Sequence, residues 1–266
     1  MIELKFSDFY SEAHGQLREA LDFIFSKSDE VQKADFLSYT VILTDNFSED
    51  MCGITKNHLN GHFINNVIYN NKIVPVCQVE NNHSDCIVVN KAVLNLPVPE
   101  IISDFTYSMY FLYYAGKLKN EIITHDLKMY YMRLAVSYLS DKKALTNFFD
   151  FIDFKNYEIR VEKIRESILC AACSNISIPE PVQCALSIIH FCFYIAHLQA
   201  LKKRGAIPSD EYWPHAETYF SRLFGESYSN LKRIFDSDSA DYESLLNKTD
   251  WTTLSALFLD FSINDH

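Results

Sequence analysis

Residues 179–205 read PEPVQCALSIIHFCFYIAHLQALKKRG, and the middle of this stretch is apolar on nearly every side of a helix. Such a helix has to be covered all round by other elements of the fold. Pro179 and Pro181 suit a first helical turn, whose N–H groups have no partner inside the helix. Gly205 suits a left-handed stop after three basic residues that favour the negative end of the dipole. The stretch predicts a central, buried helix.

A membrane span is the alternative interpretation, because about 20 apolar residues suffice to cross a bilayer. Polar side chains interrupt the stretch at Gln183, Ser187, His190, His197 and Gln199. No second stretch of similar apolarity has the flanks of a span. The sequence therefore favours a helix buried in protein.

Patterns along the chain predict a mainly α fold, a helical bundle around the central helix (about 179–205) with a small antiparallel β insertion near residues 60–95. Helical spacing of apolar residues covers 1–45 and most of the chain from residue 99 onward. Short β-branched runs at 63–69, 72–79 and 86–94 predict three strands. Pro75 inside the second run predicts an edge or a bulge.

Pro97 and Pro99 predict a boundary between N-terminal helices with the β segment (1–98) and a helical domain (99–266). One continuous domain remains the alternative, since 266 residues fit either arrangement.

Composition excludes several classes of function. Only 6 glycines occur, and no glycine-rich phosphate-binding motif is found, which disfavours a nucleotide-binding fold. The net charge of −11 disfavours binding of nucleic acid by the whole surface. A local basic patch is the exception that the sequence offers, formed by Lys202, Lys203, Arg204, Lys232 and Arg233.

Seven cysteines without a disulfide-scaffold spacing predict reduced thiols and a cytoplasmic location. The N-terminal residues lack the charged and then apolar pattern of a secretion signal. Abundant Phe, Tyr, Ile, Asn and Lys suggest AT-rich coding DNA, and hence a bacterial, phage or mobile-element source.

One candidate metal site combines four residues of the β-rich segment. Imidazole and thiolate groups are the ligands that zinc prefers, and four of them would stabilise a small sheet with little core of its own. The predicted ligands are His58, His62, His83 and Cys86. The sequence as a whole favours no bound cofactor, since their spacing matches no standard zinc module, and zinc at these residues is the alternative.

Asp85 and Lys91 give a weak nuclease-like pattern, an acid on a predicted strand with a lysine at the far end of the CIVVN run. Metal-dependent cleavage needs a second carboxylate beside the lysine, and Asn90 occupies that place in the sequence.

Aromatic side chains on helices predict protein interfaces, because they offer large contact area at little conformational cost. The candidate interface residues are Tyr110, Tyr113, Tyr114, Tyr212 and Trp213. For the first three residues, core filling is an equally good interpretation.

The sequence thus favours a non-catalytic, protein-binding accessory subunit of an intracellular multi-protein complex, with an antiviral defence system of a bacterium or mobile element as its setting. The competing hypothesis is a metal-dependent hydrolase or nuclease that uses His, Cys and Asp residues of 52–86.

Overall fold

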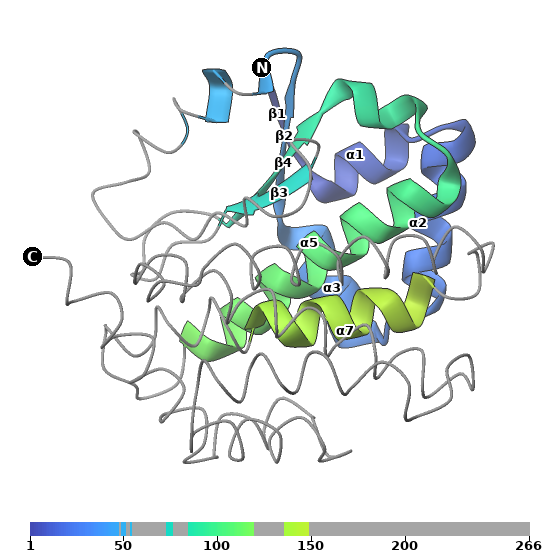
Figure 1. The fold of residues 1–266 in the computed structure, drawn as a ribbon, viewed down its shortest axis with the longest axis vertical. Helices are drawn as coiled ribbons and strands as arrows, with labels where there is room; N and C mark the ends of the chain where they lie inside the picture. Colours follow the sequence, from blue (N-terminus) through green and yellow to red (C-terminus); the bar gives the residue numbers. More distant parts are fainter. Residues whose placement is uncertain (48, 52–53, 55–72, 77–84, 120–135, 149–266) are drawn as a thin grey trace, which may run out of the picture. The chain divides into compact units, whose positions relative to one another are not determined.

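The computed structural model describes residues 1–47, 49–51, 54, 73–76, 85–119 and 136–148 (Figure 1). All of these except residues 136–142 belong to one compact unit, Met1–Met132 with Lys143–Phe151. The predicted central helix at 179–205 lies outside the described residues. The predicted boundary at residue 98 stays a prediction, because most of 99–266 also lies outside them.

A four-stranded mixed sheet organises the unit and corrects the predicted fold class. Its strands are β1 (Ile2–Lys5), β2 (Thr40–Thr44), β3 (Ile73–Val76) and β4 (Cys86–Asn90), in the spatial order β1-β2-β4-β3. The outer pairs are antiparallel, whereas β2 and β4 are parallel. The prediction of a helical bundle with a small antiparallel insertion was wrong here, since the sheet recruits two strands from the N-terminal segment that was predicted to be helical.

The composition of β2 and β4 explains why they lie in the centre. Strands buried on both faces read as continuous apolar runs rather than as alternating patterns. Val41, Ile42 and Leu43 form such a run in β2, and every residue from Cys86 to Val89 in β4 is buried. Parallel strands need a long connection, and the chain between β2 and β4 supplies one that also contains β3.

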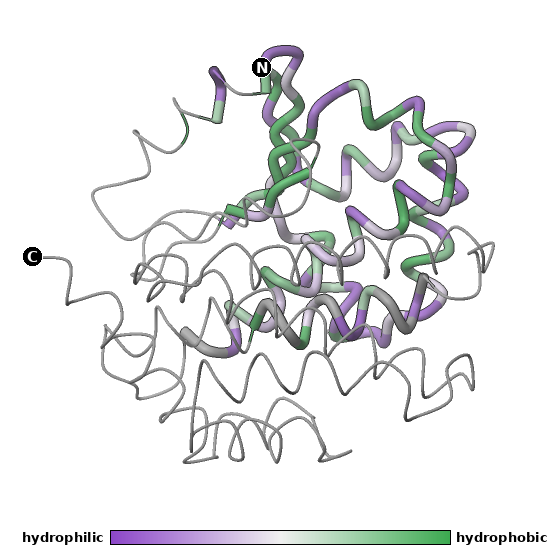
Figure 2. Tube along the Cα trace, viewed as in Figure 1, coloured by the Kyte–Doolittle hydropathy of each residue, from purple (hydrophilic) through white to green (hydrophobic). Residues whose placement is uncertain are grey.

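Helices cover one face of this sheet (Figure 1). The first three are short, and α5 is the longest described helix, with Pro99 close to its start, where a proline is tolerated. The helices are α1 (Phe6–Glu12), α2 (Gly15–Ser26), α3 (Glu30–Ser38), the 3-10 helix η1 (Lys91–Asn95), α5 (Val98–Lys119) and α7 (Ser137–Phe148). Apolar residues are concentrated along the strands and the inner sides of the helices (Figure 2).

The other face of the sheet is covered by residues that follow β2. Because side chains alternate between the faces of a strand, Ile42 and Val88 point away from the side that Val41 and Ile87 occupy. Phe47, Met51 and Ile54 pack on this second face. Both faces of the central strands are therefore sealed within the described part of the chain.

Aromatic rings dominate the core between the sheet and the helices. Phe6 at the start of α1 makes edge-on contacts with Phe25 of α2 and Phe105 of α5, with ring centroids 6.2 Å apart in each case. Phe36 of α3 meets Tyr110 of α5 in the same way at 5.3 Å. These contacts tie the three N-terminal helices to α5.

The hydroxyl of Tyr110 is the centre of a buried polar network. It donates to Oε1 of Gln32 at 3.3 Å, accepts from Nδ2 of Asn147 at 3.2 Å, and lies 3.5 Å from Oγ of Ser28. Burial raises the pKa of the Tyr110 phenol, so it stays protonated and keeps its role as a donor.

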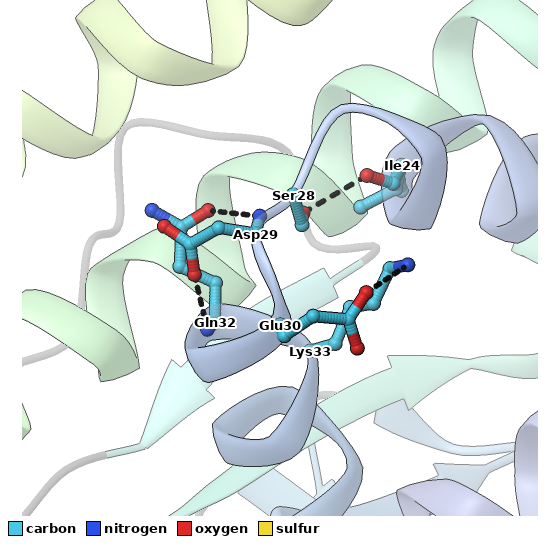
Figure 3. Close-up of polar contacts among 6 residues, drawn as sticks. All are labelled: Ile24, Ser28, Asp29, Glu30, Gln32 and Lys33. Carbon is cyan, nitrogen blue, oxygen red and sulfur yellow. Dashed lines mark hydrogen bonds and ion pairs between the residues drawn. The ribbon is translucent and has the colours of Figure 1, made fainter.

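Two of these partners, Ser28 and Gln32, lie where α2 is joined to α3 (Figure 3). Asp29 caps α3 by accepting from the Gln32 backbone N–H at 2.7 Å, and the Gln32 side chain accepts in return from the Asp29 N–H at 3.4 Å. Ser28 donates to the carbonyl of Ile24 at 2.9 Å. Tyr110 thus connects α5 to a reciprocal capping box.

Replacing Tyr110 with Phe should destabilise the protein by about 1–3 kcal/mol, because the buried Asn147 side chain loses its acceptor without gaining water and the half-buried Gln32 loses a donor. Urea unfolding of the whole chain measures this change. Tyr10→Phe is the matched control: its hydroxyl donates to Asp22 at 2.6 Å at an exposed site, so the change should stay within about 0.5 kcal/mol. Equal effects at the two positions would contradict the proposed role of the network.

Two side-chain hydroxyls of α5 are buried without a hydrogen-bond partner among the described residues. Thr106 and Ser108 are both fully buried, and no residue in the described segments accepts a hydrogen bond from either hydroxyl. A buried polar group without a partner costs free energy that an apolar group of the same shape does not.

Thr106→Val should therefore stabilise the protein by about 1 kcal/mol. The identical change at Thr44 should have the opposite sign. Thr44 is equally buried, but its hydroxyl donates to Asp50 and accepts from the Asn46 N–H at 3.1 Å. We expect Thr44→Val to cost about 1–3 kcal/mol in thermal or urea unfolding. A loss of stability in Thr106→Val would show that its hydroxyl is paired.

None of the helices in the described segments is both long enough and apolar enough to cross a membrane.

Candidate functional site

The outer side of β1 forms one edge of the described sheet. β1 pairs on one side with β2, and no described strand lies on its other side. Three of its four side chains are open to solvent: Ile2 is 48% exposed, Glu3 and Lys5 are exposed, and Leu4 is half-buried. Met1, just before the strand, is 69% exposed. An edge of this kind presents backbone groups that a further strand can pair with.

Two hydrogen bonds establish which backbone groups point outward. Opposite residues of an antiparallel pair alternate between pairs that exchange hydrogen bonds and pairs that do not. The Phe6 N–H donates to the Tyr39 carbonyl at 2.8 Å, one step beyond the pair of Lys5 with Thr40. Lys5 and Thr40 are consequently a pair that does not exchange hydrogen bonds. In agreement, the Thr40 N–H points away from β1 and donates to the Asp85 carbonyl, at 3.4 Å.

The backbone groups of Glu3 and Lys5 therefore face away from β2, because these residues are two positions apart and share one orientation. Those of Ile2 and Leu4 face β2. The Lys5 carbonyl has a further role, since Lys5 is the N-cap of α1 and its carbonyl accepts the first bond of that helix. The outer edge of β1 thus offers the N–H and C=O of Glu3 and the N–H of Lys5.

Local sequence keeps this edge in place. Phe6 directly follows β1 and is fully buried, so it anchors the end of the strand in the aromatic core. Lys5 has φ −68° and ψ 147°, an extended conformation that ends the strand and opens α1 without strain. Asp8 in the first turn of α1 favours the positive end of the helix dipole.

The opposite edge of the described sheet differs. β3 contains Pro75, opposite Ile87 of β4, and proline lacks the N–H that a further strand would require. The predicted edge position of Pro75 agrees with this placement in the described sheet. The contrast makes the outer edge of β1 the better candidate for strand addition.

A second polar group lies where the parallel strands β2 and β4 end. Lys91, just after β4, donates to the carboxylate of Asp45, just after β2, at 2.6 Å. The sequence pattern placed Asn90 beside this lysine and missed Asp45, because only the parallel pairing brings the two strand ends together. Among the described residues, no three His, Cys, Asp or Glu side chains are grouped so that they could hold a metal ion.

Cys86 is the only predicted metal ligand that the described residues include. Its side chain is 2% exposed on the second face of the sheet, among Ile42, Val76 and Val88. Burial, with a smaller contribution from the carboxylate of Asp85, raises the pKa of the Cys86 thiol to about 12. The predicted ligands His58, His62 and His83 lie outside the described residues, so the zinc site stays a prediction.

Two of the predicted interface tyrosines, Tyr110 and Tyr113, lie in the core of the described unit. Tyr110 is fully buried, Tyr113 is 7% exposed, and Tyr114 is partly exposed, with a phenol pKa raised by burial. Core filling, the alternative interpretation, describes the placement of Tyr110 and Tyr113. Tyr212, Trp213 and the five residues of the predicted basic patch lie outside the described residues.

No protein-family model matches the chain, and no curated protein or solved structure is significantly similar to it.

The state of Cys86 can be tested by alkylation. With a pKa of about 12 instead of 9.0, its thiol holds about a thousandth as much thiolate at pH 8. We expect iodoacetamide to modify Cys86 at least about 100-fold more slowly in the folded chain than in guanidinium, as measured by peptide mass spectrometry. Removal of metal with EDTA should leave this protection unchanged. Faster modification after EDTA, together with stoichiometric zinc in the purified protein, would instead identify Cys86 as a ligand.

Proposed function

We propose that the protein is a non-catalytic, protein-binding subunit of an intracellular complex, and that it binds by adding an extended segment of its partner to the outer edge of β1. The single observation that supports the proposal is the outward orientation of the Glu3 and Lys5 backbone groups on an exposed strand. In strand addition, backbone hydrogen bonds supply affinity, while the alternating side chains supply specificity.

The side chains beside this edge suit such a role. Met1 and Ile2 are two of the three large apolar residues that are exposed in the described part of the chain. Because side chains alternate along a strand, Ile2 and Leu4 lie on one face of β1, and Glu3 and Lys5, one charge of each sign, lie on the other. A partner strand would therefore find an apolar side and a charged side.

The enzymatic alternative has no comparable support in the described residues. Of its candidate His, Cys and Asp groups at 52–86, the described residues include Asp85 and Cys86, and the Cys86 side chain is buried on the apolar second face of the sheet. The cytoplasm is the location that we propose, since seven cysteines without a scaffold spacing suit a reducing compartment. A role in antiviral defence stays a prediction from composition.

A photo-crosslinker tests the proposed function in cells of the source organism. Benzoylphenylalanine in place of Ile2, which lies beside the outer edge of β1, should give a discrete protein adduct on irradiation. The same group in place of the exposed Glu12 on α1 should not give that adduct. Without an adduct from position 2, either in cells or in the purified chain at about 1 mM, the proposed function is wrong.

Two substitutions at Lys5 separate strand addition from other contacts. Lys5→Pro fits the observed φ of −68° and removes only an N–H that points away from β2, so the fold should be retained. It should abolish the adduct. Lys5→Ala keeps the N–H and should reduce the adduct by no more than about five-fold, because an exposed charge pair contributes little. An adduct that survives Lys5→Pro would rule out pairing through the backbone.

A further inference from the structure

We infer that the strand that adds to the outer edge of β1 is β1 of a second copy of this chain, paired antiparallel about a twofold axis. The inference rests on the proposed function and names its partner. A twofold interface uses the same surface on both subunits, so an edge that can pair with itself is sufficient to form one. β1 carries the charges that such self-pairing requires.

Charge selects the register. Only outward-facing residues can exchange hydrogen bonds across the new pair, and in β1 these include Glu3 and Lys5. Placing Glu3 opposite Glu3 of the second copy, or Lys5 opposite Lys5, sets like charges directly across from each other, which is destabilising. The register that places Glu3 opposite Lys5 creates two opposite-charge pairs by symmetry.

This register also allows two backbone hydrogen bonds to form. The Lys5 N–H of each copy donates to the Glu3 carbonyl of the other, which gives two backbone bonds that make no use of the Lys5 carbonyl already bound within α1. Leu4 then lies opposite Leu4 of the second copy. Leu4 is half-buried and shares its face of the sheet with the exposed Ile2, so the centre of the contact on that face is apolar.

The contact between the two strands is small, and this determines how strong the association is. Four residues per strand bury less than the area of about 1,000 Å² that a stable interface requires. The net charge of −11 on each copy also opposes association at low salt. We therefore expect weak, concentration-dependent dimers at an ionic strength of about 0.15 M, with a dissociation constant of about 0.1 mM.

Charge exchange provides the test, using sedimentation equilibrium of the full chain. Glu3→Lys places Lys opposite Lys, and Lys5→Glu places Glu opposite Glu, so each single variant should associate at least about ten-fold more weakly than the wild type. The double variant Glu3→Lys/Lys5→Glu restores both opposite-charge pairs and should associate as the wild type does. An equimolar mixture of the two single variants should form heterodimers, because each position then faces the opposite charge.

Folding does not confound this comparison, since both side chains are exposed and no ion pair joins either of them to another described residue. A wild-type chain that stays monomeric at about 1 mM overturns the inference, as does association that all four chains share to the same extent.

The position-2 crosslinker distinguishes the two levels of the proposal. An adduct of twice the 30.9 kDa chain mass supports self-pairing. An adduct that contains a different protein and is lost in Lys5→Pro overturns self-pairing but leaves the proposed function intact. The absence of any adduct, both in cells and in the purified chain at about 1 mM, overturns both.

Discussion

The parallel pairing of β2 with β4 is the contact on which the described unit depends. It joins residues 40–44 to residues 86–90 in exact opposition, from Thr40 with Cys86 to Thr44 with Asn90. Both strands are buried on two faces, so their backbone groups have no access to water and have to pair within the sheet. β1, β3 and the covering helices are placed by this pair. β2 pairs with β4 on one side and with β1 on the other, which puts β1 at the edge of the described sheet.

Some of this arrangement was predictable from local sequence. The strands at 73–76 and 86–90 lie within the runs of β-branched residues that predicted them, and the apolar spacing of α2 is that of a helix packed on a core. β2 was not predicted, because Phe36, Tyr39 and Leu43 recur at helical spacing. That spacing crosses an element boundary: α3 ends at Ser38, and the buried run that follows it is a strand. β1 was missed because four residues give too short an alternation to compete with the helical pattern behind them.

Sites formed by pairing between distant segments could not be predicted in the same way. Asp45 and Lys91 are 46 positions apart, and only the register of β2 on β4 brings them to an ion pair. The tyrosines of α5 could not be assigned from sequence for a different reason. An aromatic helix suits an interface and a core equally well, and the choice depends on what packs against it. Phe36, the α2–α3 turn and Asn147 surround Tyr110, and none of them is close to it in sequence.

An exposed strand edge is a liability unless something limits which strands can join it. Proline does so at β3 by removing a donor, which excludes every partner at that position. β1 limits its partners in a different way. Its four residues can form few backbone hydrogen bonds with a further strand. One charge of each sign on its outward-facing residues disfavours pairings that place like charges opposite each other and favours the pairing of Glu3 with Lys5. A strand that carried two lysines would repel every copy of itself, and an uncharged strand would accept any apolar segment. The combination of Glu3 and Lys5 is selective rather than protective, and this selectivity is the physical reason to regard the edge as a binding surface.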